Sequence, residues 1–164
     1  MKNMGKIREN TGFRAGIVLL AVLLFCVVSA KAEEVYFEKD VLSIQTKSGT
    51  VRLEIEMAET RKQRERGLMY RREIAESTGM LFYFKHLTAF RLWMKNTYIP
   101  LDMLFISKSG EIRQIERNTQ PHSTEIIAAK EPVLAVLEIG GGEAKRLGIE
   151  VGDRVVHPMF QKRQ

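Results

Sequence analysis

Residues 132–139 read Pro132-Val133-Leu134-Ala135-Val136-Leu137-Glu138-Ile139, an apolar run with one acidic residue near its end. A short run that is apolar on both faces predicts a strand buried on both sides of a sheet. Residues 80–84 and 99–106 have the same character, and the second of these segments also contains a single acidic residue. Together the three segments predict a sheet whose central strands are covered on both faces.

The neighbouring segments show the alternation of half-buried strands. Residues 51–57 alternate strictly between apolar and charged side chains, which predicts a strand with one face on the core. The turn sequence Lys-Ser-Gly-Thr at residues 47–50 joins this strand to residues 41–46 in a predicted hairpin. Further strands are expected at residues 90–94 and 154–156.

Two short helices are expected. Thr60 and Gln63 fit a capping box that opens a helix over residues 61–66, and Gly67 can end it. A second helix, over residues 143–147, follows a glycine triplet. Short strands, frequent glycine turns and two brief helices predict a mainly β fold, a compact β-rich barrel or sandwich in a single domain.

The first 32 residues have the composition of a secretory signal peptide. A basic stretch ends at Arg14, residues 15–28 are all apolar, and small residues occupy positions 30 and 32. We expect cleavage after Ala32 and export to the periplasm or the extracellular space, with membrane contact only through this segment. The apolar run is shorter than the roughly 20 residues that span a bilayer, which favours a cleaved signal. An uncleaved N-terminal anchor is the alternative.

Most of the charge lies in that segment. The chain has a formal net charge of +6, and residues 1–32 contain five basic residues and one acidic residue, which leaves 21 basic and 19 acidic residues in the rest. A mature net charge of +2 argues against nucleic-acid binding. The single cysteine, Cys26, lies in the same segment, so the mature chain has no disulfide, thiol nucleophile or thiolate metal site.

The mature chain divides into three expected parts. Residues 33–40 are polar and acidic and are predicted to be a tether, residues 41–157 the β-rich domain, and residues 158–164 a polar tail. The three histidines lie in separate segments without ligand spacing, and no serine occupies a nucleophile elbow. We therefore expect no catalytic set of these types, no metal site and no cofactor.

Two acids inside the apolar runs, Asp102 and Glu138, need an explanation. An unpaired buried charge is very costly, so each carboxylate must reach the surface or find a partner. The candidate partners are Arg66, Arg72, Lys95 and the amide of Asn96. The residues alone leave open a ligand pocket beside Trp93, an acid–base pair and a structural ion pair.

Five motifs run through the mature chain: Arg-Gly-Leu-Met-Tyr-Arg at 66–71, Gly-Met-Leu-Phe at 79–82, Trp-Met-Lys-Asn-Thr-Tyr-Ile-Pro-Leu-Asp-Met-Leu-Phe-Ile at 93–106, Val-Leu-Glu at 136–138 and Gly-Ile-Glu-Val-Gly-Asp at 148–153. They resemble the bacterial and archaeal family catalogued as domain of unknown function 192. The resemblance covers residues 41–157 and implies a small, β-rich single domain that is frequently exported. It implies no activity, because the family has no established one.

The resemblance singles out Arg66, Gly67, Trp93, Asn96, Thr97, Pro100, Asp102 and Glu138. Our first hypothesis is a non-enzymatic, exported binding or accessory module for a small polar ligand or a cell-envelope sugar. Its expected ligand-binding residues are Arg66, Trp93, Asn96, Asp102 and Glu138. The alternatives are a hydrolase that uses Asp102 and Glu138 as acid and base, and a structural or protein-interaction module in which these residues only fasten a loop. No particular protein partner is indicated.

Overall fold

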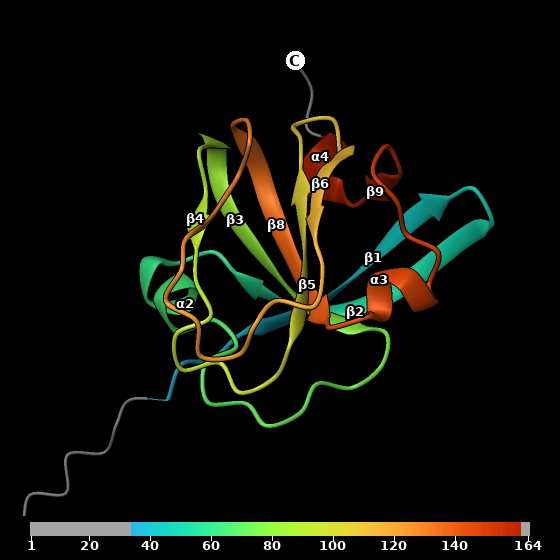
Figure 1. Cartoon of the computed structure of the whole chain (residues 1–164). Coiled ribbons are helices and arrows are strands. Elements are labelled where there is room, and N and C mark those ends of the chain that lie inside the picture. The colour runs from blue at the N-terminus through green and yellow to red at the C-terminus, as the bar shows by residue number, and fades with distance from the viewer. Residues whose placement is uncertain (1–33, 162–164) are drawn as a thin grey trace, which may run out of the picture. The chain divides into compact units, whose positions relative to one another are not determined.

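Strands dominate the computed structural model, which describes residues 34–161 (Figure 1). The strands are β1 (Glu38–Thr46), β2 (Gly49–Ala58), β3 (Thr78–Thr88), β4 (Arg91–Leu92), β5 (Leu101–Ile106), β6 (Ile112–Glu116), β7 (Ile127–Ala128), β8 (Val133–Gly140) and β9 (Arg154–Val156). The helices are α2 (Arg61–Arg66), α3 (Glu143–Arg146) and α4 (Pro158–Gln161). None of these described helices is long and apolar enough to cross a membrane. The predicted signal peptide lies outside the described residues.

Seven of these strands form one sheet in the order β6-β5-β8-β3-β2-β1-β9. Neighbouring strands are antiparallel except β2 and β3, which run parallel and are connected through the segment that contains α2. The three predicted central strands are confirmed, since residues 80–84 lie in β3, residues 99–106 supply β5 and residues 132–139 supply β8. All eight residues of β8 are buried, as expected for a strand covered on both faces.

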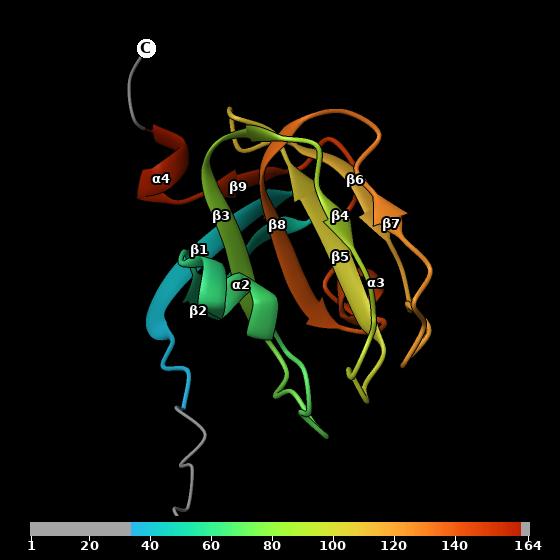
Figure 2. The same ribbon diagram turned by 90° about the vertical axis from the view of Figure 1, so that its left-hand side faces the viewer.

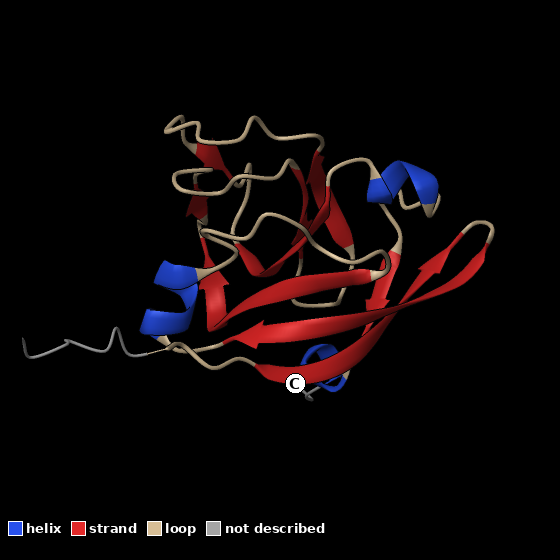
Figure 3. Ribbon diagram, turned by 90° about the horizontal axis from the view of Figure 1, so that it is seen from below, coloured by secondary structure: helices blue, strands red, loops and turns tan. Residues whose placement is uncertain are grey.

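The sheet curls into a half-barrel, as the view from below shows (Figure 3). Its edge strands, β6 and β9, meet at one end, where Glu111 and Arg154 form an isolated antiparallel bridge. A Cβ atom on Gly110 would lie 2.4 Å from the carbonyl oxygen of Val155, so this close approach requires glycine. Of the two predicted architectures, the barrel is therefore the one observed, in an incompletely closed form.

The curled sheet separates two apolar cores, because successive side chains of a strand point to opposite faces. Leu137 and Ile139 of β8 belong to the first core, together with Leu104 of β5. Val136 belongs to the second core, together with Phe105. Figure 2 shows α2 and β4 in front of the sheet on the side of the second core. The candidate site lies on this second side.

The predicted helix over residues 61–66 is confirmed as α2. Thr60 Oγ1 accepts a hydrogen bond from the backbone N–H of Gln63 at 3.2 Å, and Gln63 Oε1 accepts one from the Thr60 N–H at 2.9 Å. Gly67 ends the helix with a φ of 47°, and a Cβ atom there would lie 3.1 Å from the ring of Phe82 in β3. The end of α2, with its arginines, is therefore held against the second face of the sheet.

Both ends of the predicted domain need correction. β1 begins at Glu38, so residues 38–40, which we placed in a tether, pair with residues 55–57 of β2. Strand pairing uses backbone groups and does not require apolar side chains, which is why composition missed it. Residues 158–161, which we placed in a polar tail, form α4 and bury Met159. This helix is a third one where two were expected.

The strand predicted at residues 90–94 is also shorter than expected. Only Arg91 and Leu92 pair, and they do so with β7 in a separate two-stranded sheet. Trp93 therefore lies outside any strand, and its side chain is 45% exposed.

Candidate functional site

The two acids that the sequence singled out point to opposite faces of the sheet. In the pairing of β5 with β8, Glu138 lies opposite Met103, and Asp102 lies opposite Ile139. Met103 faces the second core and Ile139 the first, so the sheet itself separates the two carboxyl groups. A glycosidase-type pair must flank one bond from the two sides of a shared cleft. The hydrolase alternative based on Asp102 and Glu138 is therefore wrong.

Asp102 is fully buried, and its partners are backbone groups. Its Oδ1 accepts a hydrogen bond from the N–H of Asn118 at 2.8 Å, and its Oδ2 accepts one from the N–H of Ala144 at 2.9 Å. None of the side chains that we considered as partners hydrogen-bonds to Asp102 in the described structure: Arg66, Arg72, Lys95 and Asn96. Asp102 thus ties β5 to the loop after β6 and to the first turn of α3, which is the structural role that we held as an alternative.

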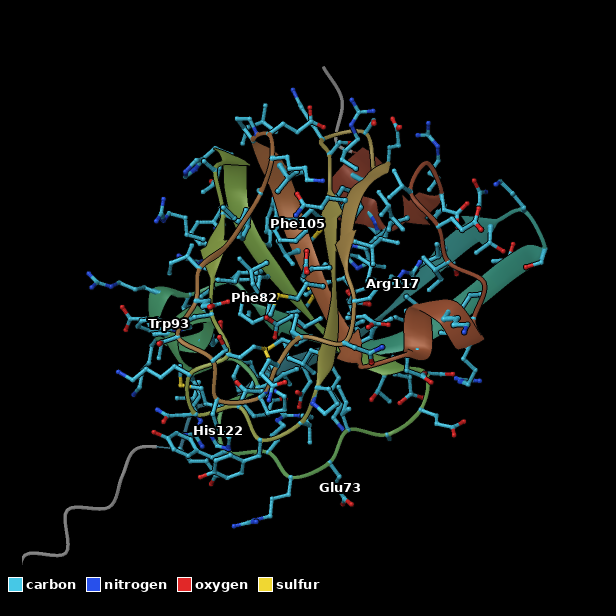
Figure 4. All side chains as sticks on the ribbon, in the orientation of Figure 1. Glu73, Phe82, Trp93, Phe105, Arg117 and His122 are labelled. Atoms are coloured by element: carbon cyan, nitrogen blue, oxygen red, sulfur yellow. The ribbon has the colours of Figure 1, made fainter. Side chains whose placement is uncertain are left out.

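Glu138 lines a cavity of about 760 Å³ on the second face, between α2 and the segment around β4. The cavity is lined by Arg61, Arg64, Glu65, Arg66, Gly67, Leu68, Met69, Phe82, Phe84, Thr88, Ala89, Phe90, Arg91, Leu92, Trp93, Thr97 and Glu138. Its inner wall is mostly apolar, with Leu68, Phe82 and Phe90 all buried. Its outer wall carries exposed side chains, and Figure 4 shows Trp93 at the periphery of the molecule and Phe82 further inside.

The Glu138 carboxyl has no hydrogen-bond donor among residues 34–161, although the residue is only 5% exposed. Burial raises the pKa of this carboxyl to about 8, from 4.5 for an ordinary glutamate. Most molecules at neutral pH therefore carry a protonated Glu138, which can both donate and accept a hydrogen bond. Every fully buried side-chain oxygen or nitrogen among residues 34–161 has a partner, so the unpaired Glu138 oxygens keep a small surface open to the cavity, where a bound ligand can pair with them.

Arginines surround the open side of the cavity. Arg64 is fixed, because its guanidinium lies 3.9 Å from the centre of the Phe84 ring and donates to the carbonyl oxygens of Glu59 and Tyr83. Arg66 is exposed and has no ion pair among the described residues, and its guanidinium lies 4.7 Å from the ring centre of Tyr70. The opening of the cavity is therefore rich in positive charge and in hydrogen-bond donors.

Three of the five predicted ligand-binding residues lie together in the structure, and two do not. Arg66, Trp93 and Glu138 line the same cavity. Asn96 lies just outside it, with its amide donating to the hydroxyl of Tyr70 at 3.1 Å. Asp102 belongs to the other face of the sheet. Within residues 34–161, no group of three His, Cys, Asp or Glu side chains is arranged to hold a metal ion.

The sequence analysis missed the aromatic residues that form the inner wall. Phe82 and Phe84 alternate along β3, and Phe90 packs edge-to-face on Phe84 with ring centres 4.6 Å apart. The alternation of side chains along a strand puts Phe82 and Phe84 on one face. What was missing was the register of β3 against β8, which pairs Met80 with Glu138 and so brings the acid beside these rings.

The fold and the cavity define a small half-barrel domain with a ligand-sized, aromatic-walled pocket. The chain belongs to the family of domain of unknown function 192 (DUF192, "Uncharacterized ACR"), whose family model matches residues 43–157. This confirms the resemblance drawn from the motifs.

Two solved structures are similar to this chain. A protein from Sinorhizobium meliloti 1021, described as a candidate transcription regulator, is 49% identical, with a TM-score of 0.74 over 77% of this chain and 98% of its own. A protein of unknown function from Novosphingobium aromaticivorans DSM 12444 is 36% identical, with a TM-score of 0.70 over 73% of this chain and 85% of its own. No curated protein matches the chain.

Proposed function

We propose that this protein is a non-enzymatic binding module whose site is the cavity lined by Trp93, Arg66 and Glu138. The observation that carries the proposal is Glu138, a nearly buried carboxyl that faces a cavity of about 760 Å³ and has no donor in the described part of the chain. Ligand pockets commonly enclose about 300–1,000 Å³ and combine apolar walls with a few polar groups. This cavity has both properties.

The chemistry of the walls favours a sugar as the ligand. The aromatic inner wall and Trp93 offer apolar surfaces to the C–H face of a sugar ring. The protonated carboxyl of Glu138 can pair with a hydroxyl group both as donor and as acceptor. Arg66 adds donors at the opening that suit further hydroxyl or carboxylate oxygens. A ligand with many hydroxyl groups uses all of these features together.

The fluorescence of Trp93 tests this proposal, because it is the single tryptophan of the chain. We expect a saturable change when the full-length protein is titrated with glucose, N-acetylglucosamine or galacturonic acid. Replacing Glu138 by leucine keeps the volume and removes the hydrogen bonds, so the affinity should fall about tenfold.

The matched control is Arg113→Ala. Arg113 pairs with Glu111 and Glu131 and does not line the cavity. This variant should bind like the wild type. If none of the three sugars changes the fluorescence, or if Glu138→Leu binds as well as the wild type, the proposal is wrong.

We also propose that the protein is exported and that residues 1–32 are removed as a signal peptide. The support is the order of a basic stretch, an apolar run and small residues at positions 30 and 32. When the full-length chain is expressed in a bacterium with a periplasm, the periplasmic fraction should contain a protein that begins at Glu33. Intact mass spectrometry measures this directly. A chain that keeps residues 1–32 and stays with the membrane would show that the segment is an anchor.

A further inference from the structure

Three aromatic side chains from three separate loops stand next to one another beside the cavity. The ring centres of Tyr70 and Tyr98 are 6.2 Å apart, and those of Tyr98 and His122 are 5.0 Å apart. We call Tyr70, Tyr98 and His122 the aromatic row. All three residues are exposed, although Tyr70 and Tyr98 are large and partly apolar. The sequence analysis did not find this group, because its members are up to 52 positions apart in the chain.

Cationic side chains accompany the rings. The guanidinium of Arg66 lies 4.7 Å from the ring centre of Tyr70, and that of Arg72 lies 5.3 Å from the ring centre of Tyr98. Neither arginine has an ion pair with a carboxylate among residues 34–161. Each is therefore held over a ring while its positive charge stays available to an outside group.

Two residues of the aromatic row, and the neighbouring Asn96, have left-handed backbone conformations. Tyr70, Asn96 and His122 have φ values of 68°, 60° and 64°, a region that tyrosine rarely adopts and that asparagine and histidine enter more readily. The loops are joined by backbone hydrogen bonds, from the Tyr70 N–H to the Asn96 carbonyl at 2.8 Å and from the His122 N–H to the Thr97 carbonyl at 3.1 Å. The strained backbone of Tyr70 and the two hydrogen bonds set the arrangement of the rings before any ligand binds.

The aromatic row is continuous with the cavity. Arg66 lines the cavity and covers Tyr70. Thr97 also lines the cavity and accepts the hydrogen bond from His122. In Figure 4, Trp93 and His122 lie on the same side of the molecule. A ligand that fills the cavity and extends outward past Arg66 therefore meets the aromatic row next.

We propose that the cavity and the aromatic row form one elongated site for an acidic oligosaccharide, with one sugar unit in the cavity and the next on Tyr70 and Tyr98. This inference rests on the proposed function, because it assumes that a sugar occupies the cavity. The carboxylate of the second unit would pair with Arg72 or Arg66, and its ring face would contact a tyrosine.

The geometry favours a sugar chain over a single-stranded nucleic acid. Successive bases stack on parallel aromatic faces, but the rings of Tyr70 and Tyr98 are inclined by 86° and offer an edge beside a face. The Asn96 amide also donates a hydrogen bond to the Tyr70 hydroxyl at 3.1 Å, so hydrogen-bonding groups accompany the rings. Residues 33–164 also carry nearly balanced charge, with 21 basic and 19 acidic residues, which is low for a nucleic-acid surface.

The test is the dependence of affinity on ligand length, measured by calorimetry with the full-length protein. The ligands are galacturonic acid and its di- and trimer, and the neutral controls are N-acetylglucosamine and its di- and trimer. For the wild type we expect about a tenfold gain in affinity from the acidic monomer to the acidic dimer, and a smaller gain for the neutral series. Arg72→Ala and Tyr98→Ala should lose the gain for the acidic dimer and keep the affinity for the monomer.

The outcomes separate this inference from the proposed function. If the acidic monomer binds but the dimer binds no better, the elongated site is wrong and the cavity site stands. If no sugar of any length binds, both are wrong. A higher affinity for an oligothymidylate than for the galacturonate trimer, lost in Arg72→Ala, would also overturn the inference and would assign the aromatic row to nucleic acid. Arg113→Ala, at a distance from the row, should behave as the wild type throughout.

Discussion

Replacing Asp102 by asparagine should lower the free energy of unfolding by about 3 kcal/mol, as expected when a buried charged acceptor of two hydrogen bonds is lost. The two oxygens of Asp102 accept from the N–H groups of Asn118 and Ala144. An asparagine side chain has one oxygen and one NH₂ group, so one of these backbone donors would face another donor. Urea unfolding followed by circular dichroism measures the difference.

Glu150→Gln is the matched control for this experiment. Glu150 also loses a charge, but its partner is Lys47 and both side chains are largely exposed, so little change is expected. The sugar affinity of Asp102→Asn should equal that of the wild type, because Asp102 lies on the face of the sheet opposite the cavity. Unchanged stability would show that the two backbone hydrogen bonds do not hold α3 in place.

The second large effect concerns the dependence of stability on pH. Folded Glu138 keeps its proton up to a pKa of about 8, whereas an ordinary glutamate loses it near 4.5. Between these values the folded state binds more protons than the unfolded state, so stability must fall as the pH rises. The expected loss between pH 5.5 and pH 8.5 is about 3 kcal/mol from this residue. Unfolding in urea at the two pH values measures it.

Glu138→Gln should remove this loss, because the amide does not titrate and keeps the shape of the side chain. Glu125→Gln, which changes an exposed glutamate, should leave the loss unchanged. If the wild type and Glu138→Gln lose the same stability from pH 5.5 to pH 8.5, the carboxyl is not held protonated by burial. A saturating sugar should raise the stability at both pH values, since ligands that bind only the folded state stabilise it.

The sequence predicted helices and strands well where neighbouring residues in the chain determine them. The capping box of Thr60 and Gln63 and the glycine at position 67 are short-range signals, and the helix between them is observed. The apolar runs at 80–84, 99–106 and 132–139 form central strands, as predicted. Each run is short and apolar on both faces, which fits a strand buried on both sides of a sheet. The ends of the domain were less predictable, since backbone pairing at residues 38–40 does not depend on side-chain type.

The candidate site was only partly predictable, because it depends on strand register. Asp102 and Glu138 looked equivalent, and a shift of one residue between β5 and β8 would have put them on the same face. The partners of Asp102 were not predictable either, since backbone N–H groups occur at every residue except proline. Arg66, Trp93 and Glu138 were named together from the sequence and line one cavity, but the rings of the inner wall and the aromatic row come together only in three dimensions.

The contact between β6 and β9 also bears on self-association. The two edges of an open sheet carry unpaired backbone groups, on which strands from other copies of the chain can add. Here the edges curl toward each other and meet at Glu111 and Arg154, and the charged side chains of Arg113 and Glu116 stand along β6. Growth of the sheet from copy to copy is therefore opposed without full closure of the barrel. Gly110 permits this contact, since a side chain there would push against the backbone of β9 and weaken the protection of both edges.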